Sequence, residues 1–336
     1  MSNAKTVSWL SAAMMAASLS PVRADDFYRG KTVEVLVGFS PGGGYDAYGR
    51  ALASVIGKYI PGRPTVVVRN MTGAGSLTLA TYLQSAAPRD GLTFGIFDDG
   101  LLIAPLIKPE TVRLNPSKLT WIGSTAKDQQ VCMIWSQSPV KKVEDLRGAQ
   151  TVFGVTGLDD IRYMSTAMLR NVIGGNVKII PGYPGSADIR LAVEKKELDG
   201  VCDSWQSVKG TKADWINEKK ITVLVQMGLK SHPDLVGVPL VGDFAEKPSD
   251  RAALAMLVAP SESGRAFAAP PDTPADRLQA LRRAFDQSVK DSEFLAITSK
   301  ANLEVDPLTG EEVEGYIKQI YATSETDIQR AREMVK

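Results

Sequence analysis

The sequence predicts an α/β protein of two lobes, each built on a mostly parallel sheet flanked by helices. Apolar runs of strand length alternate with helical patterns, and glycine-rich turns follow two of the strands. The alternation begins again near residue 139, which indicates a second unit. The 336 residues are enough for two domains, and the composition, 44% hydrophobic and 23% charged, is that of a globular protein.

The first unit begins with two strands that each end in a glycine turn. The run VEVLVGF at 33–39 is rich in β-branched residues and breaks at Ser-Pro-Gly-Gly-Gly (40–44), and a helix is expected over 45–59. The run TVVVRN at 65–70 breaks into Met-Thr-Gly-Ala-Gly-Ser (71–76) before another helical pattern. Both turns therefore come at helix starts.

In a parallel sheet these turns meet at one edge, where ligands bind. Glycine allows backbone N–H groups to point toward a ligand, and a helix N-terminus carries partial positive charge. The two turns predict a site that holds a small carboxylate-like molecule with backbone rather than with catalytic side chains.

The other elements follow from the same patterns. In the first unit, further strands are expected at 92–97, 119–125 and 131–136. The second unit is expected to contain strands at 151–155, 177–183 and 201–203 and helices at 159–172 and 184–195. After it we expect a strand at 221–226 that returns to the first sheet, a strand at 254–258, a surface loop at 260–274, and helices at 277–289 and 311–335. Lobe 1 would then be 25–138 plus 204–336, and lobe 2 the insertion 139–203.

Charge and motif content exclude several function classes. Lys and Arg total 39 and Asp and Glu 38, which gives no basic footprint for nucleic acid. The one histidine, His232, leaves little for a His-based triad or a multi-histidine metal site. Asp98 and Asp99 are adjacent and point in different directions, so no metal site is expected there. A Gly-x-Ser-x-Gly elbow, a P-loop and a nucleotide-binding GxGxxG are absent from the turns, and no cofactor is expected.

Cys132 and Cys202 are the two cysteines. Both lie in apolar, strand-like surroundings, where a cysteine is commonly a small buried hydrophobe. In an oxidising compartment the pair can also form a disulfide, and the sequence leaves both possibilities open.

The N-terminus resembles a secretory signal. A thin basic region at Lys5 precedes a short apolar stretch at 7–17, and Pro-Val-Arg-Ala (21–24) ends in a small residue. We expect export to the periplasm with cleavage after Ala24. The alternative is a disordered N-terminus or a cloning remnant, which Ser-Asn-Ala at 2–4 resembles.

Three segments resemble the receptor subunits of tripartite tricarboxylate transporters, the Bug family (TctC-type) of extracytoplasmic solute receptors. They are VEVLVGFSPGGGYDAYGRAL, VVVRNMTGAGSLTLATYL and AAPRDGLTFGIF, in the order and at the spacing typical of the family. The resemblance runs from about residue 31 to near the C-terminus and weakens after residue 235. It implies a two-lobed, type II periplasmic-binding-protein fold in which backbone amides and ordered water hold a carboxylate between the lobes.

The resemblance also implies a set of ligand-binding residues. Those of the first lobe are Phe39, Ser40, Gly42, Gly43, Gly44, Tyr45, Asp46, Gly73, Ala74, Gly75 and Ser76. Those of the second lobe are Thr156, Gly157, Asp159, Tyr183, Gly185, Ser186, Ala187 and Asp203. The chain departs from the family in having Leu-Asp-Asp at 158–160 in place of a Ser/Gly-rich loop.

Some of these residues have two interpretations. Asp46 is either ligand-side or a first-turn carboxylate that stabilises its helix, and the structural role is favoured. Ser76 and Ser186 either donate to a carboxylate or cap helices, and Asp159 and Asp160 fit caps better than contacts. A carboxylate near the cleft disfavours a plain di- or tricarboxylate and leaves an amino acid, a hydroxylated acid or an aromatic acid open.

The function that these features imply is periplasmic solute capture. The receptor, expected to be a monomer, would close its lobes on a small organic acid and deliver it to the membrane permease subunits of a tripartite transporter. One alternative is a ligand-sensing protein that docks a signalling partner, which needs the same cleft. A less favoured alternative is an α/β enzyme, which the fold alone does not exclude.

Overall fold

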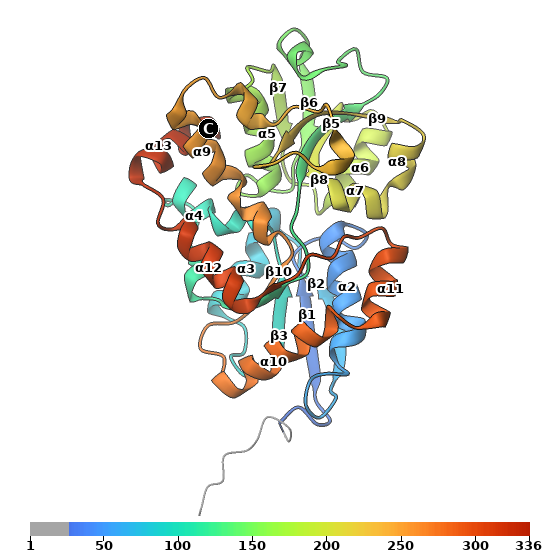
Figure 1. Cartoon of the computed structure of the whole chain (residues 1–336), viewed down its shortest axis with the longest axis vertical. Helices are drawn as coiled ribbons and strands as arrows, with labels where there is room; N and C mark the ends of the chain where they lie inside the picture. Colours follow the sequence, from blue (N-terminus) through green and yellow to red (C-terminus); the bar gives the residue numbers. More distant parts are fainter. Residues whose placement is uncertain (1–26) are drawn as a thin grey trace, which may run out of the picture.

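The computed structural model describes residues 27–336 and has two lobes, one above the other in Figure 1. The expected signal segment, residues 1–24, lies outside the described residues. Within 27–336, no helix has both the length and the apolar character needed to cross a membrane.

The first lobe is built on a six-stranded sheet in the order β11-β4-β10-β3-β1-β2. The strands are β1 Thr32–Val37, β2 Thr65–Asn70, β3 Thr93–Ile96, β4 Thr120–Ser124, β10 Ala266–Ala269 and β11 Leu308–Thr309. β1 is parallel to both β2 and β3, whereas β10 is antiparallel to β3 and β4. The parallel trio brings the ends of β1, β2 and β3 to one edge, which faces the second lobe.

The second lobe is built on a five-stranded sheet in the order β7-β6-β8-β5-β9. Its strands are β5 Gln130–Trp135, β6 Thr151–Gly154, β7 Val177–Ile180, β8 Gly200–Ser204 and β9 Ile221–Met227. β6 is parallel to β7 and β8, and β5 is antiparallel to β8 and β9. The ends of β6 and β8 point toward the first lobe, so both lobes direct turns into the junction.

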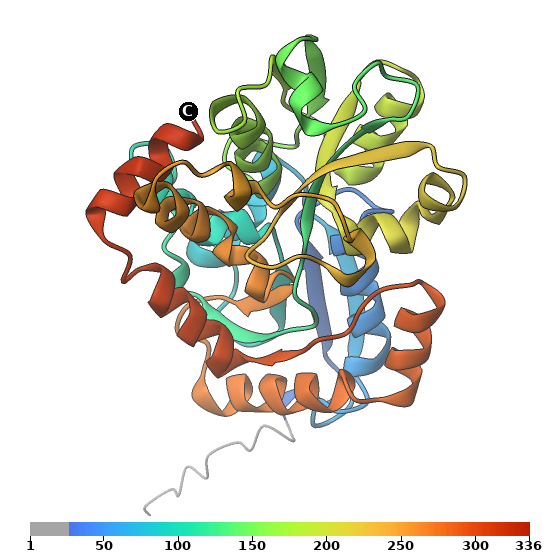
Figure 2. The same cartoon turned by 45° about the horizontal axis from the view of Figure 1, so that its top comes forward.

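Helices cover both sheets. Those of the first lobe are α2 Gly44–Ile56, α3 Leu77–Ser85, α4 Ala104–Ile107, α10 Ala275–Ser288, α11 Ser292–Lys300 and α12 Gly310–Ile320. Those of the second lobe are α5 Ile161–Asn171, α6 Ser186–Glu194, α7 Trp205–Thr211 and α8 Ala213–Asn217. α9 Pro248–Val258 packs on α13 Glu325–Met334, which also contacts α4 and α5 and so bridges the lobes, as Figure 2 shows.

Burial explains why α2 forms where it does. Its apolar residues Tyr48, Leu52 and Val55 recur at helical spacing and are fully buried against the first sheet. Gly43 is the N-cap and Asp46 lies in the first turn, where a negative charge is favourable. The helix therefore begins directly at the first glycine turn.

The chain crosses between the lobes twice, and the two crossing segments are hydrogen-bonded to each other. The Thr125 amide donates to the Arg265 carbonyl over 3.1 Å, and the Arg265 amide donates to the Ala126 carbonyl over 3.0 Å. The Asp128 amide donates to the Ser261 carbonyl over 2.8 Å. These two segments form a short hinge. Within the described chain, they are the only covalent connections between the two sheets.

Several sequence predictions are wrong here. The strand at 221–226 does not return to the first sheet, because β9 pairs with β5 in the second. The segment 254–258 is the end of helix α9, whose Pro-Ser-Asp start and alanine-rich interior favour helix. The expected loop 260–274 contains β10, whose Ala-Phe-Ala-Ala sequence lacks the usual β-branched residues and is fully enclosed by neighbours. Residues 311–335 form two helices, α12 and α13, rather than one.

The lobe limits change with the strand pairing. The second sheet contains both β5 and β9, so the second lobe extends on both sides of the expected insertion 139–203. The remaining predicted strands and the helix at 277–289 correspond to observed elements.

Cys132 and Cys202 form a disulfide between adjacent strands β5 and β8, where they are direct cross-strand partners. The bond joins residues 70 apart in the sequence, and both side chains are fully buried. It links a strand next to the hinge to the strand that carries Asp203.

Replacing both cysteines with alanine should lower the free energy of unfolding by about 2–4 kcal/mol, because the unfolded chain loses a long closed loop. Urea unfolding of the double variant and of the wild type, each with and without a thiol reductant, measures this difference. The reductant should weaken the wild type only. Equal stability of the two oxidised proteins would contradict the prediction.

Candidate functional site

The two glycine turns of the first lobe lie at the junction between the lobes. After β1, Gly42 has φ 88° and the chain then enters α2. After β2, four successive residues, Gly73, Ala74, Gly75 and Ser76, have positive φ. Ala74 and Ser76 pay a conformational cost of order 1 kcal/mol or more for this left-handed geometry, which is typical of functional turns.

The turns touch the helix starts of the second lobe directly. A Cβ on Gly43 would lie 3.6 Å from Ser186 Cβ, and one on Gly42 would lie 3.7 Å from Ala187 Cβ. A Cβ on Gly44 would lie 2.7 Å from Ser207 Cβ, closer than real side chains approach. Backbone without side chains is therefore required for the lobes to meet at Gly44.

The second glycine turn approaches the loop after β6 in the same way. A Cβ on Gly157 would lie 2.6 Å from the Gly75 nitrogen, and one on Gly75 would lie 2.8 Å from Asp160 Cβ. Asp160 is fully buried, caps α5 by accepting from the Tyr163 amide over 2.8 Å, and also bonds the Thr156 hydroxyl. The lobes are thus closed at both turns.

Rim contacts add to this closure. The Ser40 amide donates to the Pro184 carbonyl over 3.2 Å, and its hydroxyl donates to Asp188 Oδ2 over 2.6 Å. A Cβ on Gly185 would lie 3.1 Å from the Ser40 nitrogen. On the opposite rim, Lys108 Nζ lies 3.1 Å from Asp159 Oδ1.

Three sequence-predicted site residues make their contacts within their own lobe. Asp46 accepts from the Gly42 amide and from the side chains of Arg50 and Asn70, and these bonds lower its pKa even though burial opposes them. Gly73 faces Thr78 of the same lobe, and Tyr183 packs on the second-lobe core. The other predicted residues come together at or beside the junction.

Charged side chains, not only backbone, occupy the junction. Eight residues, at most 5% exposed, form what we call the interlobe charge cluster: Asp98, Asp99, Asp128, Asp160, Asp203, Arg162, Arg190 and Arg265. Of these only Asp203 was among the residues predicted to bind the ligand. Sequence reasoning stressed the backbone of the glycine turns and did not identify the other seven charged residues.

Asp203, at the end of β8, pairs with two guanidinium groups. Arg162 Nη2 donates to Asp203 Oδ1 over 2.9 Å and to Ser186 Oγ over 2.5 Å. Arg190 Nη2 donates to Asp203 Oδ2 over 2.5 Å. Burial alone would raise the pKa of Asp203, but the charges of Arg190 and Arg162 lower it to about 2. Asp203 is therefore ionised at neutral pH.

Asp98 and Asp99, after β3, are the first-lobe members of the cluster. Asp98 Oδ1 accepts from the amides of Gly100 (2.9 Å) and Ile161 (2.8 Å), the second across the lobes. Burial, with the charge of Asp99, raises the pKa of Asp98 well above its usual range, which the Arg162 charge only partly offsets. Burial and the charge of Asp128 raise the pKa of Asp99 to about 7.

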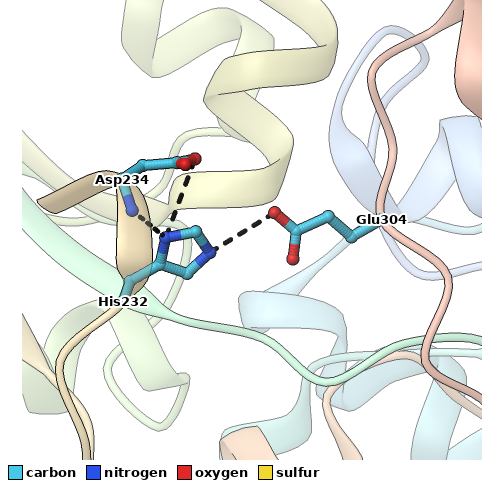
Figure 3. Close-up of side chains that lie close together, drawn as sticks. All are labelled: His232, Asp234 and Glu304. Atoms are coloured by element: carbon cyan, nitrogen blue, oxygen red, sulfur yellow. Dashed lines mark hydrogen bonds and ion pairs between the residues drawn. The ribbon is translucent and has the colours of Figure 1, made fainter.

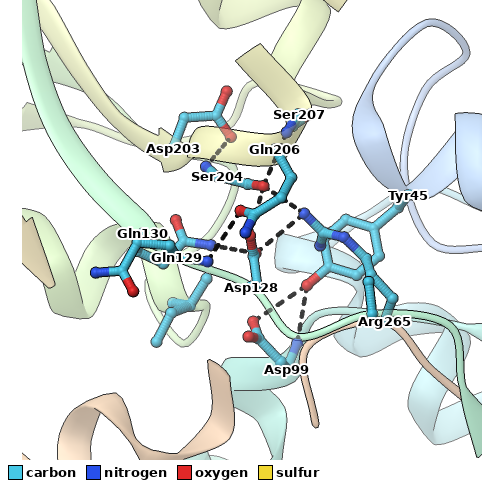
Figure 4. A network of polar contacts seen from close by, with 12 residues as sticks. Tyr45, Asp99, Asp128, Gln129, Gln130, Asp203, Ser204, Gln206, Ser207 and Arg265 are labelled. Carbon is cyan, nitrogen blue, oxygen red and sulfur yellow. Dashed lines mark hydrogen bonds and ion pairs between the residues drawn. The ribbon is translucent and has the colours of Figure 1, made fainter. Parts of the chain in front are cut away.

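Arg265 joins the hinge to the site, as Figure 4 shows. Its Nη2 lies 3.0 Å from Asp128 Oδ2 and donates to Ser204 Oγ over 2.6 Å. Its guanidinium stands 4.2 Å from the Tyr45 ring centre, and the Tyr45 hydroxyl donates to Asp99 Oδ1 over 3.1 Å. Cation–π contact and hydrogen bonding thus connect α2, the hinge and the end of β3.

A second polar cluster holds the lobes together away from the turns. Glu304 of the first lobe lies 3.3 Å from His232 Nε2, and Figure 3 shows His232 between Glu304 and Asp234. The ligand atoms of these three residues lie within 4.8 Å of one another, as a metal site would require. Lys209 Nζ, however, bonds both Asp234 and Glu304. The ammonium group already pairs with both carboxylates, so we interpret the cluster as an interlobe contact.

Two cavities open beside the contact between His232, Asp234 and Glu304. One of about 570 Å³ lies between α7–α8 and the segment after α11, and its lining includes Lys209, Asn217 and Glu304. The other, about 490 Å³, adjoins the hinge and includes Asp128 and His232. Residues of the glycine turns line neither cavity, which is consistent with lobes closed directly on one another.

The comparisons with known proteins show the fold. The periplasmic binding protein BugD superimposes with a TM-score of 0.72 at 22% identity, over 87% of this chain and 95% of that one. MatC from Rhodopseudomonas palustris with bound malate gives 0.69 at 18% identity, over 91% and 99% of the two chains. R. palustris Rpa4515 with adipate gives 0.69 at 18% identity, over 90% and 97%.

The fold is therefore that of the two-lobed periplasmic binding proteins, and the predicted fold class is confirmed. The family resemblance drawn from the three sequence motifs agrees with these neighbours. No family model and no curated protein matches the sequence.

The raised pKa of Asp99 predicts a pH effect on stability. Between its ordinary value of about 3.9 and about 7, the native state binds more protons at this group than the unfolded chain does. The contribution of Asp99 to the free energy of unfolding should therefore fall as pH rises through this window. For this one proton, the slope is at most about 1.4 kcal/mol per pH unit.

Asp99→Asn keeps an acceptor for Tyr45 but removes the titration. The difference in free energy of unfolding, wild type minus variant, should fall between about pH 5 and about pH 7. Urea midpoints of both proteins across this range measure it. Parallel pH profiles would show that Asp99 does not titrate in this window.

Proposed function

We propose that this protein is a periplasmic solute receptor that binds a small carboxylate-bearing molecule between its lobes and delivers it to a membrane permease. The observation that carries the proposal is the closure of two glycine turns onto second-lobe helix starts around buried polar groups. Side-chain-free turns at the ends of parallel strands are suited to anion binding. An enzyme would need a nucleophile and a base close together at this junction. Solute binding needs only groups that hold the ligand.

The neighbours support the chemical class of the ligand. MatC is described with bound malate and Rpa4515 with adipate, both small organic acids, and BugD is described as periplasmic. The permease partner, of the tripartite tricarboxylate type, rests on the three sequence motifs. Export by a cleaved signal at Ala24 and a monomeric state remain part of the same proposal.

Capture would work by bending at the hinge. A solute that contacts both lobes favours the closed state by its differential affinity for that state. The Thr125–Arg265 backbone bonds stay within the hinge, whereas the Ser40–Asp188 bond joins the two rims. Opening therefore breaks rim contacts while the hinge pairing persists.

A thermal-shift screen of aliphatic, hydroxylated, aromatic and amino acids tests the proposal. A ligand at ~100 times its Kd should raise the free energy of unfolding by about 2.7 kcal/mol. Genomic or pull-down association with two membrane subunits would support transport, whereas association with a sensor kinase would favour signalling. If no acid of any class shifts the unfolding transition, the proposed function is wrong.

A pair of glycine-to-alanine variants tests closure. Gly44 and Gly315 both lie in helices, but a Cβ on Gly44 would clash with Ser207 of the other lobe, whereas one on Gly315 meets nothing within 4 Å. Such overpacking costs about 1–3 kcal/mol in the closed state. Gly44→Ala should therefore weaken binding by roughly 5- to 150-fold, as measured by calorimetry.

Gly315→Ala is the matched control. It should leave the affinity unchanged and raise the free energy of unfolding by about 0.5–1 kcal/mol, because alanine favours an exposed helix position. Circular dichroism should show the same secondary structure in both variants. Equal affinities of the two variants would mean that the ligand-bound state does not bring Gly44 against Ser207.

A further inference from the structure

Buried polar atoms of both signs are left without hydrogen-bond partners at the junction. Asp98 Oδ2 and Asp99 Oδ2 accept no hydrogen bond within the described structure, and Arg162 Nε and Nη1 donate none. The three residues are 0%, 4% and 1% exposed. A buried polar group without a partner is costly, which points to an external partner for these atoms.

Each of these side chains is anchored on one side and free on the other. Asp98 Oδ1 is held by two backbone amides, and Arg162 Nη2 is held by Asp203 and Ser186. The free atoms face each other, since Arg162 Nη1 lies 3.5 Å from Asp98 Oδ2, an ion pair beyond hydrogen-bond contact. A donor-seeking oxygen and an acceptor-seeking nitrogen are thus fixed side by side.

The balance of carboxylates and guanidinium groups at the junction also indicates what charge a ligand should carry. In the second lobe, Arg162 and Arg190 both pair with Asp203, and the charge of Asp160 also acts on Arg162, while at the hinge Arg265 pairs with Asp128. The two carboxylates in excess of the guanidinium groups are therefore those of the first lobe, Asp98 and Asp99. Burial already raises the pKa of both carboxyl groups, and a ligand with negative charge alone would favour their protonated forms further, whereas an ammonium group would favour the ionised forms that accept hydrogen bonds.

We propose that the ligand is a small α-amino acid, whose carboxylate binds Arg162 and whose ammonium group binds Asp98 with Asp99. This inference rests on the proposed function and narrows its ligand class. A zwitterion brings no net charge, and its two charged groups, on one carbon atom, match neighbouring free groups of opposite sign. A plain carboxylate would pair with the guanidinium but would bring no hydrogen-bond donor to the two aspartate oxygens.

The protonation of the cluster is consistent with this ligand. Burial holds the pKa of Asp99 at about 7, so this group is partly protonated at neutral pH. A nearby ammonium charge would lower that pKa, and binding should release protons near pH 7. A dianionic ligand would do the opposite and take protons up.

Matched ligand pairs test the inference. L-glutamate and glutarate differ only in the ammonium group, as do L-alanine and propionate. Calorimetric titration of the wild type at about pH 7.5, in buffers of different ionisation enthalpy, gives both the affinity and the proton balance. We expect at least one amino acid to bind at least ~10-fold more tightly than its deaminated partner, with proton release.

Asp98→Asn tests the assigned residue. It keeps the Oδ1 acceptor for the two amides and removes the charge, so the preference for the amino acid should fall at least ~10-fold. Asp250→Asn is the control, because Asp250 is a buried carboxylate paired with Arg330 outside the junction. The control should keep the wild-type preference.

The outcomes separate the inference from the proposed function. If plain acids bind the wild type as well as or better than their amino counterparts, the inference is overturned and the receptor function stands. The same holds if Asp98→Asn binds and keeps the full preference. If neither class of ligand binds the wild type, the receptor function fails and the inference fails with it. The wild-type comparison decides the matter even where a variant does not fold.

Discussion

The double ion pair of Asp203 with Arg162 and Arg190 is the interaction on which the rest of the site depends. Three charges lie fully out of solvent at the end of β8, and removing one partner would leave a buried charge uncompensated, at a cost of about 3–5 kcal/mol. One carboxylate cannot satisfy two guanidinium groups. Arg162 therefore keeps two donor nitrogens without hydrogen bonds, and one of them, Nη1, lies 3.5 Å from Asp98 Oδ2 of the first lobe.

Two kinds of residue therefore have different roles in the closed junction. Glycine turns allow the backbones of the two lobes to come within van der Waals distance, and they carry no charge of their own. The charged side chains fill the buried space between the lobes at these turns. The close approach of the lobes thus depends on Gly44, Gly75 and Gly157, whereas the buried charges at the junction include those of Asp98, Asp99 and Arg162.

The sequence was most informative where structure depends on local features. Strands β1 and β2, the two glycine turns and helix α2 could be predicted, because β-branched runs and glycine act through near neighbours in the chain. The lobe to which β9 belongs could not be predicted. Its antiparallel pairing with β5 depends on residues about 90 positions away in the sequence, and no local pattern signals this contact. β10 was missed for a related reason, since its small alanines fit a crowded central position only once the sheet exists.

The charged residues of the site also could not be predicted from local sequence patterns. Arg162 lies in an amphipathic helix and Arg265 follows a Ser-Glu-Ser-Gly stretch, so each reads as an ordinary surface residue. Their burial depends on carboxylates from other elements. One signal was available: Asp98 and Asp99 come two and three residues after the end of a buried strand, at the edge of the sheet where ligands bind, and they were considered only as a metal site.

The hinge divides the contacts of the closed state into two kinds. Arg265 and Asp128 belong to the crossing segments themselves, and Arg162 and Asp203 share one lobe, so both ion pairs can persist when the lobes separate. The Asp98–Ile161 and Ser40–Asp188 bonds join the lobes and must break. Opening therefore exposes Asp98 to water but leaves the Arg162 anchor assembled. Under the proposed function, the open second lobe would first offer Arg162 to an anionic group, and closure would then bring the first-lobe carboxylates against the bound ligand.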